Sequence, residues 1–127
     1  MKRAEKVLQD WLNALNTGDV EKLLLLYNEK SLLIPTFSDR IIKSEYKRRE
    51  YFEKLKKREN LSVTLHDKTV IYQQMSETIF GISGIYCWHF SIEDEPLSFE
   101  ARFSYLVDVS LPHPILHHHS SQIPRTL

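Results

Sequence analysis

The order of apolar and polar residues divides the chain into a helical first part and a strand-rich second part. In residues 4–15 the apolar side chains recur at helical spacing and form one stripe. Asn16-Thr17-Gly18 ends this helix, with a glycine suited to a left-handed C-terminal cap. Asp19 can cap a second helix that continues through residues 23–27. The pattern therefore predicts two helices joined by a three-residue break.

A short strand and a third helix are predicted next. Residues 31–36 have the composition of a strand, and Pro35 places it at a sheet edge or at its own end, because proline cannot donate to a ladder. A loop at residues 37–40 follows. Ser44 can then cap a helix over residues 45–58.

This third helix has an apolar side and a strongly basic side. Tyr51, Phe52 and Leu55 carry the apolar side. The basic residues are Lys47, Arg48, Arg49, Lys54, Lys56, Lys57 and Arg58. Two interpretations stay open, a solvated face paired with neighbouring glutamates or a basic surface that docks a partner.

From residue 61 onward the apolar period changes to two, which is typical of strands. The predicted strands cover residues 61–74, 79–92, 97–109 and 115–123, with turns at 93–96 and 110–114. Helices followed by antiparallel strands predict an α+β fold, in which the helices pack on one face of a curved sheet. We expect a single domain over residues 1–127.

Composition narrows the class of protein. The chain is 42% hydrophobic and 27% charged, which suits one globular domain with one core and excludes a disordered chain. The formal net charge is zero, so no overall bias indicates nucleic acid. No apolar run approaches a membrane span or a signal-peptide core, and Cys87 is expected to be a buried, inert thiol. We expect a cytoplasmic protein with no membrane partner.

Three consecutive histidines, His117, His118 and His119, are the most conspicuous local feature. Metal binding, a purification tag and catalysis are the alternatives. Strand alternation predicts that His117 and His119 share a face with Ile115, while His118 lies on the opposite face. Zinc would need a third protein ligand that the spacing does not provide, and the triplet is short and internal to a patterned strand, so we predict neither a metal nor a tag.

Catalysis would require one of these histidines as general base. Asp39 is a candidate acid partner if the loop after the first strand folds over the sheet. No glycine-rich phosphate loop, nucleophile elbow or paired-cysteine motif is present, and no cofactor is predicted. The simpler interpretation of His117 and His119 is a structural pair lining a polar cavity.

Several motifs together resemble a known family. They are Ser38-Asp39-Arg40, Tyr51-Phe52, Gly84-Ile85-Tyr86, Ala101-Arg102-Phe103-Ser104-Tyr105 and His117-His118-His119-Ser120-Ser121. In order and spacing they resemble the bacterial relatives of the calcium/calmodulin-dependent protein kinase II association domain, within the nuclear transport factor 2-like (SnoaL-like, cystatin-like) superfamily. The resemblance implies a cone, in which a strongly bent sheet wraps around three N-terminal helices, and a dimer formed through the sheet.

The chain also departs from this family. The turn at residues 110–114 has two prolines in place of the usual Gly-Lys-Trp. The resemblance aligns the kinase pocket's arginines near Tyr86, Tyr105 and Ser120, which predicts an aromatic, weakly polar pocket for a neutral or flat organic ligand. The predicted ligand-binding residues are Tyr86, Trp88, Tyr105, His117, His119 and Arg40. Arg102, on the opposite face, and His118 are predicted at the sheet interface.

Three functional hypotheses result. The first is a homodimeric association or small-ligand-binding module without catalytic activity. The second is an isomerase or hydrolyase with His117 or His119 as general base, assisted by Asp39 or Tyr86. The third is a scaffold that docks a protein partner through the basic helix over residues 45–58.

Overall fold

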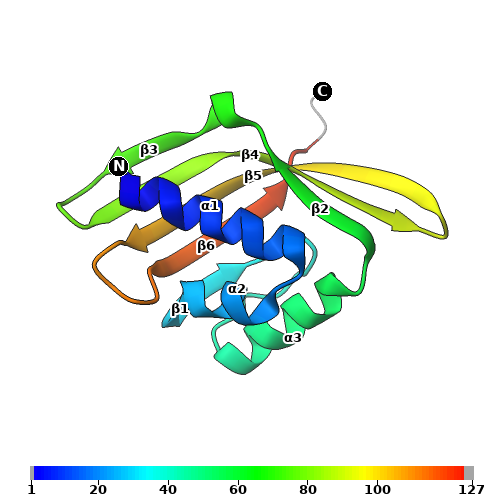
Figure 1. Ribbon diagram of the computed structural model, residues 1–127, viewed down its shortest axis with the longest axis horizontal. Helices are drawn as coiled ribbons and strands as arrows, with labels where there is room; N and C mark the ends of the chain where they lie inside the picture. Colours follow the sequence, from blue (N-terminus) through cyan, green and yellow to red (C-terminus); the bar gives the residue numbers. More distant parts are fainter. Residues whose placement is uncertain (1, 125–127) are drawn as a thin grey trace.

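The computed structural model describes residues 2–124 as three α-helices and one six-stranded sheet (Figure 1). The helices are α1 (Lys2–Thr17), α2 (Val20–Leu26) and α3 (Glu45–Lys56). The strands are β1 (Tyr27–Ile34), β2 (Glu59–Leu65), β3 (Ile71–Gln74), β4 (Ile79–Ile92), β5 (Glu95–Asp108) and β6 (Ile115–Gln122). Within these residues, no helix is long and apolar enough to cross a membrane.

The helix boundaries follow the predicted caps. Gly18 adopts a positive φ of 69°, a conformation that glycine reaches without strain, and so ends α1. The side chain of Asp19 accepts a hydrogen bond from the backbone N–H of Lys22 at 3.1 Å. Ser44 accepts one from the backbone N–H of Lys47 at 3.2 Å. These contacts satisfy N–H groups that have no partner inside the first turn of a helix.

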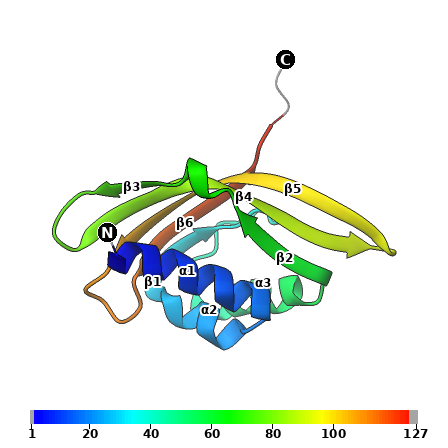
Figure 2. The same ribbon diagram turned by 45° about the horizontal axis from the view of Figure 1, so that its top comes forward.

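All three helices lie on the same face of the curved sheet (Figure 2). The strand order is β1-β6-β5-β4-β2, and β3 pairs with another part of β4. β1 and β6 are parallel, and the other pairs are antiparallel. The predicted α+β fold with a mostly antiparallel sheet around N-terminal helices is therefore confirmed.

Two predicted strands have different boundaries. The single strand expected over residues 61–74 is two strands separated by a 3₁₀ turn at Asp67–Thr69. Thr69 Oγ1 holds this turn in place, because it donates to the carbonyl of His66 at 2.7 Å and accepts from the N–H of Ile85 at 2.9 Å. The first strand begins at Tyr27 and ends before Pro35, at the sheet edge.

The core lies between α1 and the concave face of the sheet, with Trp11 at its centre. This side chain is 1% exposed. Its ring stacks on Tyr86 with centroids 5.6 Å apart and meets Trp88 and Tyr105 edge-on at 6.1 and 5.9 Å. Such pairs add to the stabilisation that comes from burying a large apolar area. The apolar stripe of α1 therefore fills the interior of the cone.

Candidate functional site

The histidine strand faces the opposite way from the prediction. His118 is 2% exposed and points into the core, whereas His119 is exposed and His117 half-buried on the outer face. The reason is an irregularity in β6. Val107 pairs with Ile115 but Leu106 pairs with His117, so Leu116 is an extra residue that reverses the alternation. A side chain buried in this way does not reach the outer face, where the sequence predicts the sheet interface.

His118 is the centre of a chain of buried hydrogen bonds. The indole N–H of Trp11 donates to the hydroxyl of Tyr27 at 2.9 Å. That hydroxyl lies 2.7 Å from His118 Nδ1, and His118 Nε2 lies 3.2 Å from the hydroxyl of Tyr86. The ring of Tyr105 stacks on the imidazole with centroids 3.9 Å apart. This series of hydrogen bonds links α1, β1, β4 and β6 through their side chains.

The direction of the protons in this chain follows from the partners. An indole N–H can only donate, so Trp11 cannot accept the proton of Tyr27. Among residues 2–124 the other partner of that hydroxyl is His118 Nδ1, which therefore accepts. His118 is then a neutral imidazole whose Nε2–H donates to Tyr86. Burial, with a smaller effect from His117 and His119, lowers the pKa of His118 to about 3 and agrees with this assignment.

The predicted aromatic pocket is packed core. Tyr86, Trp88 and Tyr105 are at most 2% exposed. Beside Tyr86 and Trp88 remains a cavity of about 10 Å³, which is the size of one water molecule. Trp11 packs against all three rings, so together they enclose no space for an organic ligand in this structure.

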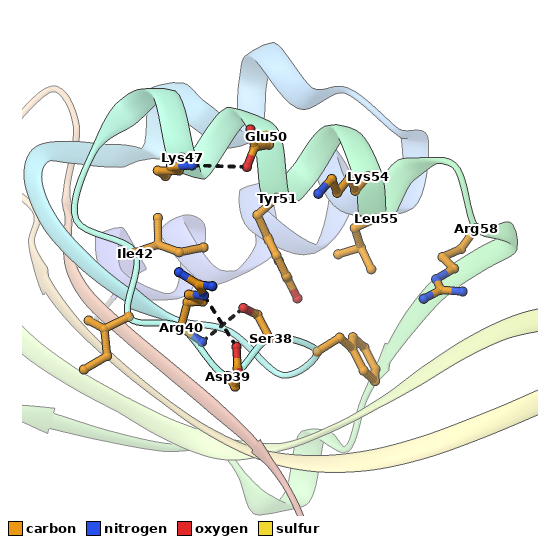
Figure 3. Close-up of a pocket in the computed structure, with 12 residues that line it drawn as sticks. Ser38, Asp39, Arg40, Ile42, Lys47, Glu50, Tyr51, Lys54, Leu55 and Arg58 are labelled. Atoms are coloured by element: carbon orange, nitrogen blue, oxygen red, sulfur yellow. Dashed lines mark hydrogen bonds and ion pairs between the residues drawn. The ribbon is translucent and has the colours of Figure 1, made fainter.

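The structure has a larger cleft elsewhere, with a volume of about 590 Å³, between α3 and the loop that follows β1 (Figure 3). Its lining residues are Phe37, Ser38, Asp39, Arg40, Ile41, Ile42, Lys47, Glu50, Tyr51, Lys54, Leu55 and Arg58. The six residues from α3 and its C-terminal end recur at helical spacing, because one face of this helix forms a wall of the cleft.

Two predicted site residues, Asp39 and Arg40, do line this cleft. Their side chains are 97% and 84% exposed, and Arg40 Nε lies 3.8 Å from Asp39 Oδ1. His119 bonds to Ser121 at 2.7 Å on the outer sheet face instead. Within residues 2–124 no hydrogen bond or ion pair joins Asp39 to a histidine, and the acid–base pair required by the catalytic hypothesis does not form in this structure.

Arg48 departs from the predicted solvated face of the third helix. It is 1% exposed and donates to the backbone carbonyls of Ser31 at 3.2 Å and Glu29 at 3.4 Å. Its guanidinium lies 6.0 Å from the ring centroid of Tyr27, and burial lowers its pKa. Helical spacing contains the signal for this position, since residue 48 stands four before Phe52 on the apolar side. Arg48 joins α3 to the edge strand β1.

The outer face of the sheet carries His117, His119 and Arg102. In the register, Arg102 lies opposite Ile85 and Ser121, and Leu106 lies opposite Gly81 and His117. No helix among residues 2–124 covers this face (Figure 2). The described residues contain no group of three histidine, cysteine, aspartate or glutamate side chains that could hold a metal ion.

The fold class is α+β, with a curved sheet wrapped around α1 and a network of hydrogen-bonded side chains in the core. Comparison with known proteins then identifies the family. Residues 2–124 match the model of the calcium/calmodulin-dependent protein kinase II association domain, and the chain belongs to that family. No curated protein matches the sequence.

Three solved structures illustrate the likeness of fold. A Xanthomonas campestris protein described as a calcium/calmodulin-dependent protein kinase II association domain is 21% identical, with a TM-score of 0.86 over 97% of this chain and 87% of that one. The S. rosetta CaMKII hub is 16% identical, with a TM-score of 0.78 over 96% and 95%. An NTF-2-like protein of unknown function from Shewanella oneidensis MR-1 is 18% identical, with a TM-score of 0.66 over 94% and 97%.

Proposed function

We propose that this chain is an association module that binds a second copy of itself through the outer face of its sheet. The single observation that carries the proposal is that all three helices occupy the concave side and leave β4, β5 and β6 uncovered on the other (Figure 2). Membership of a family of association domains supports it. The S. rosetta relative is described as a hub, which agrees with the same role.

The composition of the outer face also supports self-association. Ile71 and Met75 are 61% and 60% exposed, and Met75 Cε comes within 3.2 Å of the position that a Cβ would take on Gly81. Leu106 and Ile85 lie half-buried on the same face. Leu106 is paired with Gly81, and Ile85 is paired with Arg102. Apolar surface of this kind on an uncovered sheet is typical of protein contact sites.

Charges on this face suit a twofold pairing. Arg102 and Glu100 are both exposed and two residues apart on β5, so they point to the same side. In an isologous dimer the same patch meets itself, and a cation of one copy can face an anion of the other. The neutral net charge of the chain opposes such contact only weakly.

Sedimentation velocity of the wild type and of Arg102→Glu tests the proposal. We expect the wild type to sediment as a dimer or larger species at micromolar concentration and Arg102→Glu to dissociate about tenfold more readily, because like charges then face each other. Arg3→Glu makes the same charge reversal at an exposed residue of α1, on the side of the sheet that carries the helices, and should sediment like the wild type. A monomeric wild type, or equal dissociation of both variants, would contradict the proposal.

A further inference from the structure

The cleft between α3 and the loop at residues 37–42 has two kinds of wall. Apolar groups come from Phe37, Ile41, Ile42 and Leu55, and the ring of Tyr51 extends from α3 toward Ser38 (Figure 3). Cationic groups come from Arg40, Lys47, Lys54 and Arg58. A site of about 590 Å³ with both kinds of wall falls within the size range of small-molecule pockets.

The charges in the cleft are unequal. Its four cationic side chains face two carboxylates, those of Asp39 and Glu50. Asp39 lies 3.8 Å from Arg40, and Glu50 lies 3.6 Å from Lys47. Among residues 2–124, Lys54 and Arg58 have no carboxylate within ion-pair distance. The positive potential therefore concentrates at the end of the cleft formed by the last turn of α3.

These two cations are placed differently. The guanidinium of Arg58 lies 5.2 Å from the ring centroid of Phe90, an arrangement that restrains the side chain while its N–H groups stay free to donate. Lys54 lies in the last turn of α3, Arg58 lies just beyond the end of the helix, and both line the same cleft. Both side chains therefore attract an anionic group at this end, and each has N–H groups that can donate to it.

A third observation concerns Tyr51. Its hydroxyl is buried beside the backbone of Phe37, and among the described residues it makes no hydrogen bond of normal geometry. Tyr51 therefore lines the cleft through its ring, and its buried hydroxyl is not open to a ligand there. Burial raises the pKa of Tyr51, so the side chain stays neutral and adds no negative charge beside the cations of the cleft.

We infer that this cleft binds an amphiphilic organic anion, with its aromatic or aliphatic body against Phe37, Tyr51 and Leu55 and its sulfonate, carboxylate or phosphate group at Lys54 and Arg58. This site is separate from the packed aromatic core, and its charge favours an anion over the neutral ligand predicted from the sequence. The inference does not depend on self-association through the sheet.

The test uses the fluorescent probe anilinonaphthalene sulfonate, together with phenylnaphthylamine, which keeps the aromatic body but lacks the sulfonate. We expect the sulfonate to bind the folded wild type at least tenfold more tightly than the neutral compound. The double variant Lys54→Gln/Arg58→Gln should weaken sulfonate binding about tenfold, with little effect on the neutral compound.

The matched control is Lys56→Gln/Lys57→Gln. It removes the same charge from the same end of α3 at exposed residues that do not line the cleft, and it should bind the sulfonate like the wild type. Equal affinity for the charged and neutral probes would overturn the inference. So would equal weakening by the two double variants, or no sulfonate binding below about 1 mM.

Discussion

The buried imidazole of His118 makes the stability of the fold dependent on pH in a defined direction. In the unfolded chain a histidine has a pKa of about 6.5. In the folded chain burial lowers the pKa of His118 to about 3. Between these values the unfolded state binds a proton that the folded state does not, so the free energy of unfolding falls as pH falls. His118 therefore leaves the free energy of unfolding at its full value above pH 6.5 and lowers it progressively as the pH falls toward 3.

The expected loss follows from the two pKa values. Each unit of difference corresponds to about 1.4 kcal/mol, so this residue should reduce the free energy of unfolding by about 2 kcal/mol between pH 7 and pH 5. Carboxylates titrate over part of the same range. A variant without the imidazole, His118→Gln, separates the two effects, since the carboxylates are common to both proteins.

The assay is urea unfolding at fixed protein concentration, followed by the fluorescence of Trp11 and Trp88. Wild type should be more stable than His118→Gln at pH 7, because the variant disrupts the bonds to Tyr27 and Tyr86. That advantage should shrink by about 2 kcal/mol at pH 5. His119→Gln, exposed on the same strand, is the control for loss of an imidazole and should show no comparable change.

A second measurement examines the proton directly. In an NMR titration of the folded protein, the ring signal of His118 should not shift between pH 7 and pH 4.5, since the imidazole is neutral throughout this range. A titration midpoint above about pH 5.5, or an advantage over His118→Gln that is the same at both pH values, would refute the assignment of a neutral buried imidazole.

Two further predictions concern single positions in the fold. Arg48→Ala should lower the free energy of unfolding by about 3 kcal/mol, measured by urea unfolding, because it leaves two backbone carbonyls of β1 without their donors; the exposed neighbour Arg49→Ala should change it little, and equal effects would contradict the role of the buried guanidinium. Gly84→Ala should cost about 1–3 kcal/mol, since a Cβ would come within 3.0 Å of the ring of Phe103. Gly81→Ala should destabilise the fold less, because the new Cβ would meet only the flexible end of the Met75 side chain. If thermal melting shows Gly81→Ala to be the more destabilising of the two, the packing argument is wrong.

The elements and the fold class could be predicted from the sequence because local signals agree with the final structure. Gly18, Asp19 and Ser44 act as the caps that their residue types favour. The period-two pattern places Tyr86 and Trp88 on the concave face, where both are buried. These signals depend on a few neighbouring residues, and distant contacts do not alter them.

The site could not be predicted in the same way, because it depends on one extra residue and on contacts across the core. Strand alternation is exact only where the ladder is regular, and Leu116 interrupts it. One inserted residue is enough to exchange the faces of His118 and of its two neighbours. The prediction of an open aromatic pocket also failed to account for how the interior is filled. Trp11 of α1 packs into the space between the sheet and the helix.

The α3 helix connects the stability of the fold to the proposed ligand site while keeping the two separable. Arg48 and Phe52 face the core and β1, whereas Lys54 and Arg58 line the cleft. A substitution on the core side should change the unfolding free energy and, through the position of the helix, the cleft as well. A substitution at the two cleft cations should change ligand affinity with only a small change in the unfolding free energy, since both side chains are exposed and the contact of Arg58 with Phe90 is the one packing interaction described for them among residues 2–124. Self-association uses the other side of the sheet, so loss of the dimer in Arg102→Glu should leave probe binding intact.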